Sequence, residues 1–200
     1  MKIVVIGAGT VGKYVIEELK QLGEVIVCSR KSAEFSVDVS DKGSIEALFE
    51  KIGPCDHVVV VVGKTPIVPF QQATDEQFSQ TIATKLMGQI NVVRVGMRYL
   101  RRGGSFTLTT GYLSRLLVEN VTIPAFVNAA LERFIVNVAL EMKDLFRINA
   151  ASPAMLEDSL KTYGKEAFQD FPIISGKEVG RAYFELIDSN MTGAVFKVEP

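Results

Sequence analysis

Short apolar runs alternate with longer stretches of helical periodicity along nearly the whole chain. Apolar runs rich in β-branched residues are typical of strands, and apolar residues spaced three and four apart are typical of helices. Strands are therefore expected at residues 3–6, 24–28, 36–39, 57–62, 105–110, 147–150 and 194–198. Helices are expected at residues 10–22, from 41 or 44 to 51, and at 75–102, 124–142, 155–169 and 177–189.

This alternation predicts an α/β fold in which a parallel sheet carries helices on both faces. Residues 57–62 are apolar throughout, as in a strand that is buried on both faces of such a sheet. The 200 residues contain no internal repeat and no linker. We therefore expect a single domain over residues 1–200, a doubly wound parallel sheet in three α/β/α layers.

A glycine turn follows the first expected strand directly and opens the first helix. Gly7 permits a tight turn, Gly9 lets backbone N–H groups approach a ligand, and Gly12 lets the helix pack against the strand. In this strand–turn–helix order the pattern predicts a dinucleotide whose pyrophosphate binds at the helix N-terminus, with Thr10 and Val11 in the binding turn. The alternative is a glycine-rich connection without a ligand.

Charge and cysteine content narrow the class of partner and the compartment. A formal net charge of -1 provides no basic field for nucleic acid or an anionic membrane. The apolar start is too short for a signal peptide, and residues 58–62 are too few to cross a bilayer. Cys28 and Cys55 lie among apolar residues, which favours buried free thiols over a disulfide or a regulatory thiol. The protein is expected to be cytoplasmic.

Ligands of doubly wound sheets bind beyond the carboxyl ends of the strands, around the point where the strand order reverses. The segments expected on this rim are residues 7–12, 29–31, 38–39, 63–65, 110–112 and 153–154. We therefore expect the ligand and any chemistry there, with Pro153 among the cofactor contacts.

The end of the second expected strand bears on the choice of dinucleotide. An NAD site usually has a carboxylate there for the ribose hydroxyls, but this chain has Ser29, Arg30 and Lys31. A hydroxyl and two cations suit the 2′-phosphate of NADP(H) through charge-assisted hydrogen bonds. The sequence therefore favours NADP(H) over NAD(H), unless the two cations are only solvated loop charges.

Two further rim positions are candidate contacts of the adenosine. The carboxylate of Asp38, at the end of the third expected strand, suits the adenine amino group, and Val39 would pack on the ring. Asp38 could instead belong to the cap of the following helix. Gly63 ends the fourth expected strand and either allows close approach to the ribose or simply forms a turn.

Several segments in the same order resemble the short-chain dehydrogenase/reductase superfamily over nearly the whole chain. They are the glycine turn, the triplet at residues 38–40, GSFTLTT at 104–110, RINAASPA at 147–154 and the terminal helix followed by residues 192–195. The resemblance is to a small, divergent branch with a shortened connection between the second and third strands and a glycine turn one residue tighter than TGxxxGxG. It implies a Rossmann-type fold, a nicotinamide cofactor, hydride transfer between a carbonyl and an alcohol, and dimers or tetramers.

The resemblance also assigns the family's catalytic positions to residues of this chain. The family protonates the carbonyl oxygen with Ser, Tyr and Lys, supported by Asn. Gly111 stands at the serine, Pro124 at the tyrosine, Asn128 at the lysine and Lys85 at the asparagine. The tetrad is therefore expected to be absent, because a proline has no proton to give and an amide carries no charge to lower the pKa of a phenol.

A nicotinamide can still transfer hydride if another group polarises the carbonyl. Rim candidates are Thr110, Tyr112, Lys85 and Lys64, with Tyr112 and Lys85 as a replacement pair, or as surface residues without a role. His57, the only histidine, opens a buried strand away from the rim and is expected to be structural. One histidine and two distant cysteines predict no metal site.

The long helical stretches at residues 75–102 and 124–142 are apolar on more than one side. This favours a homodimer or homotetramer formed through them, although packing in the core alone would also account for it.

Two functional hypotheses fit these features. The first is an NADP(H)-dependent oxidoreductase that acts on a small carbonyl or alcohol with a non-standard proton donor. The second is a non-catalytic NADP(H)-binding redox sensor or regulatory protein. A scaffold that binds no nucleotide is weaker, because the glycines and Arg30 are retained. Residues 64–72 and 155–172 would cover the nicotinamide, and they have no chemical signature that predicts the substrate.

Overall fold

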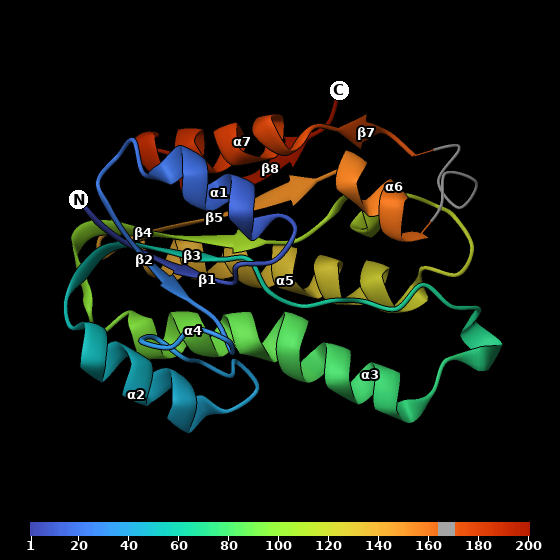
Figure 1. Ribbon diagram of the computed structural model, residues 1–200, viewed down its shortest axis with the longest axis horizontal. Coiled ribbons are helices and arrows are strands. Elements are labelled where there is room, and N and C mark those ends of the chain that lie inside the picture. Colours follow the sequence, from blue (N-terminus) through green and yellow to red (C-terminus); the bar gives the residue numbers. More distant parts are fainter. Residues whose placement is uncertain (164–170) are drawn as a thin grey trace.

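A parallel sheet with the strand order β2-β1-β3-β4-β5-β8 forms the centre of the computed structural model, which describes residues 1–163 and 171–200 (Figure 1). The chain moves outward from β1 to β2 and returns to β3 on the other side of β1, so the strand order reverses between β1 and β3. The strands are β1 Lys2–Ile6, β2 Glu24–Cys28, β3 Cys55–Val60, β4 Leu100–Thr109, β5 Arg147–Pro153 and β8 Val195–Val198.

Helices cover both faces of this sheet. On one face α1 (Gly12–Leu19) packs against α7 (Gly176–Asp188), and on the other lie α2 (Lys42–Ile52), α4 (Gly88–Gly96) and α5 (Thr122–Glu141) (Figure 1). An apolar cluster fills the space on each face. The expected doubly wound, three-layer α/β/α fold is confirmed.

The strands nearest the reversal point are buried as the apolar pattern predicted. Residues 3–6 of β1 are at most 1% exposed, and residues 58–60 of β3 are fully buried. Alternate side chains of these strands enter the two clusters, so both faces of the central strands are covered.

Residues 36–39, expected as a strand, do not pair with the sheet, and this prediction is wrong. They form an irregular segment beyond β2, in which the N–H of Val37 donates to the carbonyl of Ser29 at 3.3 Å. Val37 and Val39 are buried in the cluster beside α2, while Asp38 between them is exposed. The alternation therefore reflects two anchoring side chains in a loop and no strand pairing.

The helix expected over residues 75–102 is interrupted and ends early. α3 (Asp75–Thr81) runs through a π-helical segment, Ile82–Met87, into α4, which ends at Gly96. The N–H of Tyr99 donates to the carbonyl of Gly96 at 2.9 Å, and the chain turns there. Residues 100–104 are extended and belong to β4, because Leu100 pairs with Cys55 ahead of a register shift.

The elements predicted for the C-terminal third of the chain are confirmed in part. α7 and β8 lie close to their expected positions. Of the helix expected at 155–169, α6 covers Glu157–Tyr163, and residues 164–169 lie outside the described residues. Two short strands, β6 (Met155–Leu156) and β7 (Ile173–Ile174), pair with each other in a separate small sheet that the pattern did not predict.

One helix of the described chain, α5, is long and apolar enough by length and composition alone to cross a membrane. Every fourth residue from Ile123 to Ile135 is nevertheless at most 2% exposed, so one side of α5 packs in the core. Phe126 and Leu140 are 43% and 72% exposed on its outer side. Apolar residues on both sides of α5 were expected from the sequence.

Candidate functional site

The glycine turn lies between the ends of β1, β2 and β3, at the reversal point. Gly7 has a φ of 114°, and its N–H donates to the carbonyl of Cys28 at 2.8 Å. A Cβ on Gly7 would collide with the carbonyl of Val61, and one on Gly12 would collide with the carbonyl of Gly7. A Cβ on Gly9 would have no neighbour within 4 Å. The first and third glycines therefore shape the turn, and the second keeps its outer side clear.

The first turn of α1 has the properties of an anion site. Backbone N–H groups of Thr10, Val11 and Gly12 donate to no acceptor in the described part of the chain. Val11 occupies the N-cap without a side-chain cap, and the first turn contains no acidic residue. The partial positive charge of the helix end is therefore left for a ligand, and both observations fit a pyrophosphate.

The candidate 2′-phosphate residues follow β2 directly. Ser29 is half-buried and held by its backbone, since its N–H donates to the carbonyl of Phe35 at 3.3 Å. Arg30 and Lys31 are exposed beside it, and the N–H of Lys31 donates to the Ser29 hydroxyl at 3.3 Å. Both cations are therefore exposed at the end of β2, where they can meet a ligand.

Asp38 and Val39 have defined local roles in this structure. Hydrogen bonds from the hydroxyl and N–H of Ser40, at 2.6 and 2.9 Å, lower the pKa of Asp38. The N-cap of α2 is Asp41, whose carboxylate accepts from the N–H of Gly43 at 2.8 Å. Asp38 joins this helix end through its own N–H, which donates to the Ser44 hydroxyl at 3.0 Å. Val39 is 8% exposed and packs against Gly88. Their contacts with adenine remain predictions.

Gly63 lies against the backbone and Cβ of a buried lysine. It has a φ of 95°, and a Cβ there would stand 2.6 Å from the Cβ of Lys85. Lys85 lies in the π-helical segment, a local geometry that is frequent at functional sites, and is 6% exposed. Its Nζ donates to the carbonyls of Thr109 at 2.8 Å and Thr110 at 3.2 Å. Burial lowers the pKa of Lys85 to about 8.

The two threonines at the end of β4, Thr109 and Thr110, have their side chains on opposite faces of the sheet. The hydroxyl of Thr109 donates to the carbonyl of Val60 and shares a 2.6 Å hydrogen bond with the hydroxyl of Tyr183 on α7. Thr110 is 3% exposed, and its hydroxyl has no partner in the described structure. The buried Oδ1 of Asn128 on α5 is also unpartnered there.

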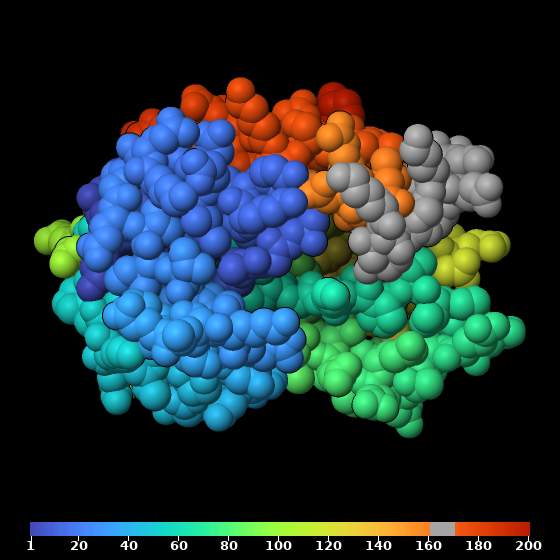
Figure 2. Space-filling model, in the orientation of Figure 1, coloured from blue at the N-terminus to red at the C-terminus, as the bar shows by residue number. Residues whose placement is uncertain are grey.

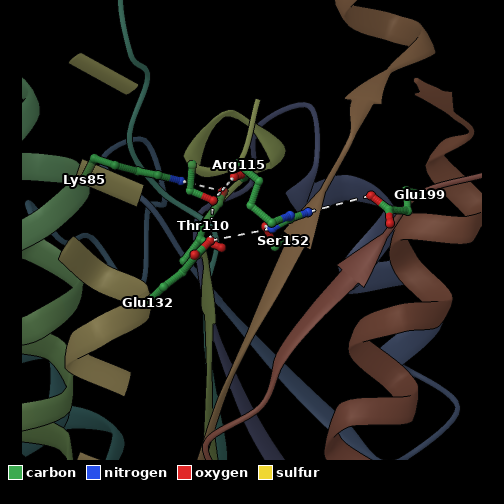
Figure 3. Close-up of polar contacts among 8 residues, drawn as sticks. Lys85, Thr110, Arg115, Glu132, Ser152 and Glu199 are labelled. Carbon is green, nitrogen blue, oxygen red and sulfur yellow. Dashed lines mark hydrogen bonds and ion pairs between the residues drawn. The ribbon is translucent and has the colours of Figure 1, made fainter. Parts of the chain in front are cut away.

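Arg115 lies beyond the ends of β4 and β5 and was missed by the sequence reasoning. Its guanidinium carbon is 5.2 Å from the centre of the Tyr112 ring, and its Nη1 donates to the Ser152 hydroxyl at 2.8 Å. The carboxylates of Glu132 and Glu199 are each 3.8 Å away (Figure 3). Ser152, Glu132 and Glu199 are distant from Arg115 in the sequence, so no local spacing could have indicated these contacts.

The predicted pair of Tyr112 and Lys85 is not brought together among the described contacts. Lys85 donates to the carbonyl of Thr110, and it is Arg115 that lies over the Tyr112 ring. Lys64 is exposed at the rim, and Pro153 ends β5 half-buried, paired with Val198. Both remain candidates by position.

His57 has the contacts of a structural residue. It is 7% exposed, its Nδ1 is 2.8 Å from the Ser105 hydroxyl, and burial lowers its pKa to about 4. The described residues contain no group of His, Cys, Asp or Glu side chains that could hold a metal ion.

A recess opens between the N-terminal helix, α6 and the chain that follows β3 (Figure 2). α6 is tied to α1 on one side of it, since Asp158 accepts from the Lys13 amine at 2.7 Å and the Tyr14 hydroxyl at 2.8 Å. Residues 64–72 and the described part of 155–172 border this recess, where they were expected to cover a nicotinamide.

A reversed parallel strand order with an uncapped helix behind a glycine turn defines a dinucleotide-binding α/β protein. A family model described as Enoyl-(Acyl carrier protein) reductase matches residues 3–179. The chain belongs to the short-chain dehydrogenase/reductase superfamily, a family of oxidoreductases.

Individual relatives agree with this assignment. The chain is 24% identical over 202 residues to a short-chain dehydrogenase/reductase of Stachybotrys chlorohalonatus, covering 90% of this chain and 79% of the relative. It is 25% identical over 178 residues to L-xylulose reductase of Homo sapiens, covering 80% and 73%.

Solved structures extend the likeness over the full length. Protein lin1944 from Listeria innocua is 36% identical with a TM-score of 0.93, and 99% of each chain is covered. A small-chain dehydrogenase crystallised in complex with NADPH is 31% identical with a TM-score of 0.87, covering 100% of this chain and 96% of that one.

Proposed function

We propose that this protein is an NADP(H)-dependent oxidoreductase that interconverts a small carbonyl compound and its alcohol. The main support is the combination of two features at the carboxyl ends of β1 and β2. The first is the uncapped first turn of α1 with open space beside Gly9, and the second is the exposed pair of cations, Arg30 and Lys31. The similar small-chain dehydrogenase crystallised with NADPH supports the choice of NADP(H).

Each part of the dinucleotide has a set of residues that fits it. The backbone of the glycine turn, with Thr10 and Val11, would bind the pyrophosphate. Ser29, Arg30 and Lys31 would bind the 2′-phosphate by charge-assisted hydrogen bonds. Asp38, Val39 and Gly63 would border the adenosine, and Pro153 the nicotinamide end. When bound, the nicotinamide supplies or accepts the hydride.

The reaction also needs a group that donates a proton to the carbonyl oxygen. The resemblance assigns Gly111, Pro124 and Asn128 to the positions of the family's serine, tyrosine and lysine, and none of these side chains is a proton donor of suitable acidity. Of the rim candidates, Tyr112 has a phenol and lies beside the Arg115 guanidinium. We infer that the donor differs from the one the family uses.

Calorimetric titration with NADP⁺, NADPH, NAD⁺ and NADH tests the cofactor assignment. NADPH is expected to bind at least about tenfold more tightly than NADH, because each charge-assisted hydrogen bond contributes roughly 1.5–3 kcal/mol. Arg30→Ala should remove most of this preference and leave NADH binding unchanged. Arg98→Ala, an exposed arginine before the amino end of β4, is the matched control. A preference for NADH in the unmodified protein would contradict the proposal.

The assignment of the family's catalytic positions favours a second candidate, a non-catalytic NADP(H)-binding sensor. In that assignment Pro124 replaces the family's proton donor and Asn128 replaces its cation. A panel of carbonyl compounds separates the two. Oxidation of NADPH by one of these compounds would support the enzyme. Its loss in Tyr112→Phe would assign the proton donor to that phenol, and its retention would assign the donor to another group. Tight NADPH binding without turnover of any compound would support the sensor.

A homodimer or homotetramer is part of this proposal. Exposed apolar side chains lie on the outer side of α5 and near both ends of α4, namely Phe126, Leu140, Met87 and Met97. Burial of such a surface against a second copy would remove it from water.

A further inference from the structure

The amine of Lys85 is buried, and the part of the chain that the structure describes holds no counter-ion for it. Lysines are rarely fully buried unless they are paired, yet no carboxylate lies within 4 Å of this amine among the described residues. Its hydrogen-bond acceptors are the two backbone carbonyls at the end of β4, those of Thr109 and Thr110. A protonated amine has three donors, so one hydrogen remains to be placed.

Two unsatisfied side chains lie on the same face of the sheet as this amine. Phe106 and Leu108 pack in the cluster that includes α4 and α5, whereas Thr109 faces α7. Because side chains alternate along a strand, the Thr110 hydroxyl points to the α4 and α5 side. Asn128 enters from α5, and its Nδ2 would be 3.1 Å from a Cβ on Gly111.

These groups are each 6% exposed or less, and they converge on the backbone of Thr110 and Gly111. An unsatisfied polar atom in the interior destabilises the folded state, and a buried water is the usual partner where two or more such groups meet. A Cβ on Gly111 would stand 3.1 Å from the Nδ2 and 3.9 Å from the Oδ1 of Asn128, so a side chain at Gly111 would crowd this amide.

The chemistry of the three groups defines what fits between them. The third hydrogen of Lys85 needs an acceptor, whereas the Oδ1 of Asn128 needs a donor. A carbonyl or carboxylate oxygen meets only the first need, and a hydroxyl-type oxygen meets both. We propose that Lys85, Thr110 and Asn128 form a buried binding site for one hydroxyl-type oxygen, which is water in the free protein.

A proton step can follow from this site, and that step alone rests on the proposed reductase function. In that enzyme Lys85 is a positioning residue, because it acts on the substrate through the bound oxygen. The bound water donates a proton to the substrate oxygen while an ammonium N–H proton of Lys85 passes to the water. The neutral amine then regains a proton from solvent. The fixed positive charge at the end of β4 also favours electron density on that oxygen.

A crystal structure of the free protein is the direct test. One ordered water is expected at about 2.7–3.2 Å from the Lys85 amine, the Thr110 hydroxyl and the Asn128 oxygen. A direct bond from Lys85 to Asn128, or no ordered oxygen there, would overturn the proposal. Crystals soaked in 2-propanol or acetone distinguish the ligand classes, since the alcohol is expected to replace the water and acetone is not. Acetone at this position would contradict the donor requirement.

Titration of the Lys85 amine by NMR of labelled lysine gives a second test without coenzyme. Asn128→Leu removes a hydrogen-bond partner of the water. Because the ammonium of Lys85 would then be less well solvated, its pKa should fall by about 1. Asn137→Leu, an exposed position on the same helix, is the control and should leave that pKa unchanged. An unchanged pKa in Asn128→Leu would count against the site. Both tests are independent of nucleotide binding.

Turnover tests the role in the reductase. Lys85→Met is expected to lower kcat by about 100-fold with NADPH affinity unchanged, and Lys85→Arg should recover part of the loss. In the unmodified protein kcat should fall above pH 8, where Lys85 loses its proton. In Lys85→Arg this fall should move to higher pH. A pH profile that is the same in both proteins would refute the proton step and leave the oxygen site standing.

Discussion

The glycines of the first turn act through different physical constraints. The missing Cβ of Gly12 avoids the carbonyl of Gly7, which belongs to the fold itself. The missing Cβ of Gly9 keeps open space beside the first turn of α1. Fold and ligand binding can therefore be separated by two similar substitutions.

Gly12→Ala is expected to destabilise the protein by about 2 kcal/mol or more, because a backbone oxygen cannot move aside cheaply. Gly9→Ala should leave the free energy of unfolding within about 0.5 kcal/mol and weaken NADPH binding by about tenfold or more, because its methyl group occupies the pyrophosphate position. Urea denaturation and calorimetry measure the two effects. Unchanged NADPH binding by Gly9→Ala would show that the pyrophosphate lies elsewhere.

The pKa of Lys85 predicts a dependence of stability on pH. In the folded protein it is lowered to about 8 from an ordinary value of 10.5. Between these values the unfolded chain holds more protons, so the free energy of unfolding should rise with pH through this window. Below pH 8 both states are protonated, and the full cost of burying the charge is present.

Denaturation of the unmodified protein and of Lys85→Met across this window isolates the amine. Cys28, Cys55 and Tyr183 have raised pKa values in both proteins, so their contributions cancel in the difference. The unmodified protein should gain stability relative to Lys85→Met as the pH rises from 8 to 10.5. Parallel curves would mean that Lys85 has an ordinary pKa.

Residues whose chemistry depends on near neighbours could be predicted from the sequence. The glycine turn and the cations after β2 belong to this kind, because strand, turn and helix are consecutive. The burial of Lys85 and the position of Arg115 could not be predicted. The contacts of Arg115 with Ser152 and Glu199 depend on strand order, and those of Lys85 depend on a π-helical segment without a sequence signature.

At the scale of elements, the apolar pattern predicted nearly every strand of the sheet and nearly every helix that covers it. It did not predict where these elements end. The glycines at 103 and 104 predicted the end of a helix, whereas Gly96 ends it. Gly96 packs closely on Phe49 and Phe106, so the chain turns where it meets the sheet and α2. Residues 36–39 show the same limit, since alternating burial in a loop looks like a strand in the sequence.

The short pairing of β6 with β7 marks another limit at this scale. Two residues in each strand are too few to produce a pattern, and they are brought together across a long separation in the sequence. Only the folded core fixes where such segments meet.

For the whole molecule, the apolar outer side of α5 carries the proposal of self-association. Leu140→Lys introduces a charge at a residue that is 72% exposed, so a monomer should tolerate it, whereas an interface should not. The mass measured by light scattering is expected to fall to half or less of that of the unmodified protein. Leu117→Lys, at a residue that is 99% exposed outside these helices, is the control and should not change the mass. A monomeric mass for the unmodified protein would refute the assembly.

Gly63 is required whatever residue stands at position 85. A Cβ on Gly63 would stand 2.6 Å from the Cβ and 2.7 Å from the Cα of Lys85, atoms that every residue except glycine also has. Its φ of 95° disfavours a side chain as well. The glycine should therefore be inherited independently of the lysine. Among descendants of a common ancestor, lineages that lose the lysine are expected to keep the glycine.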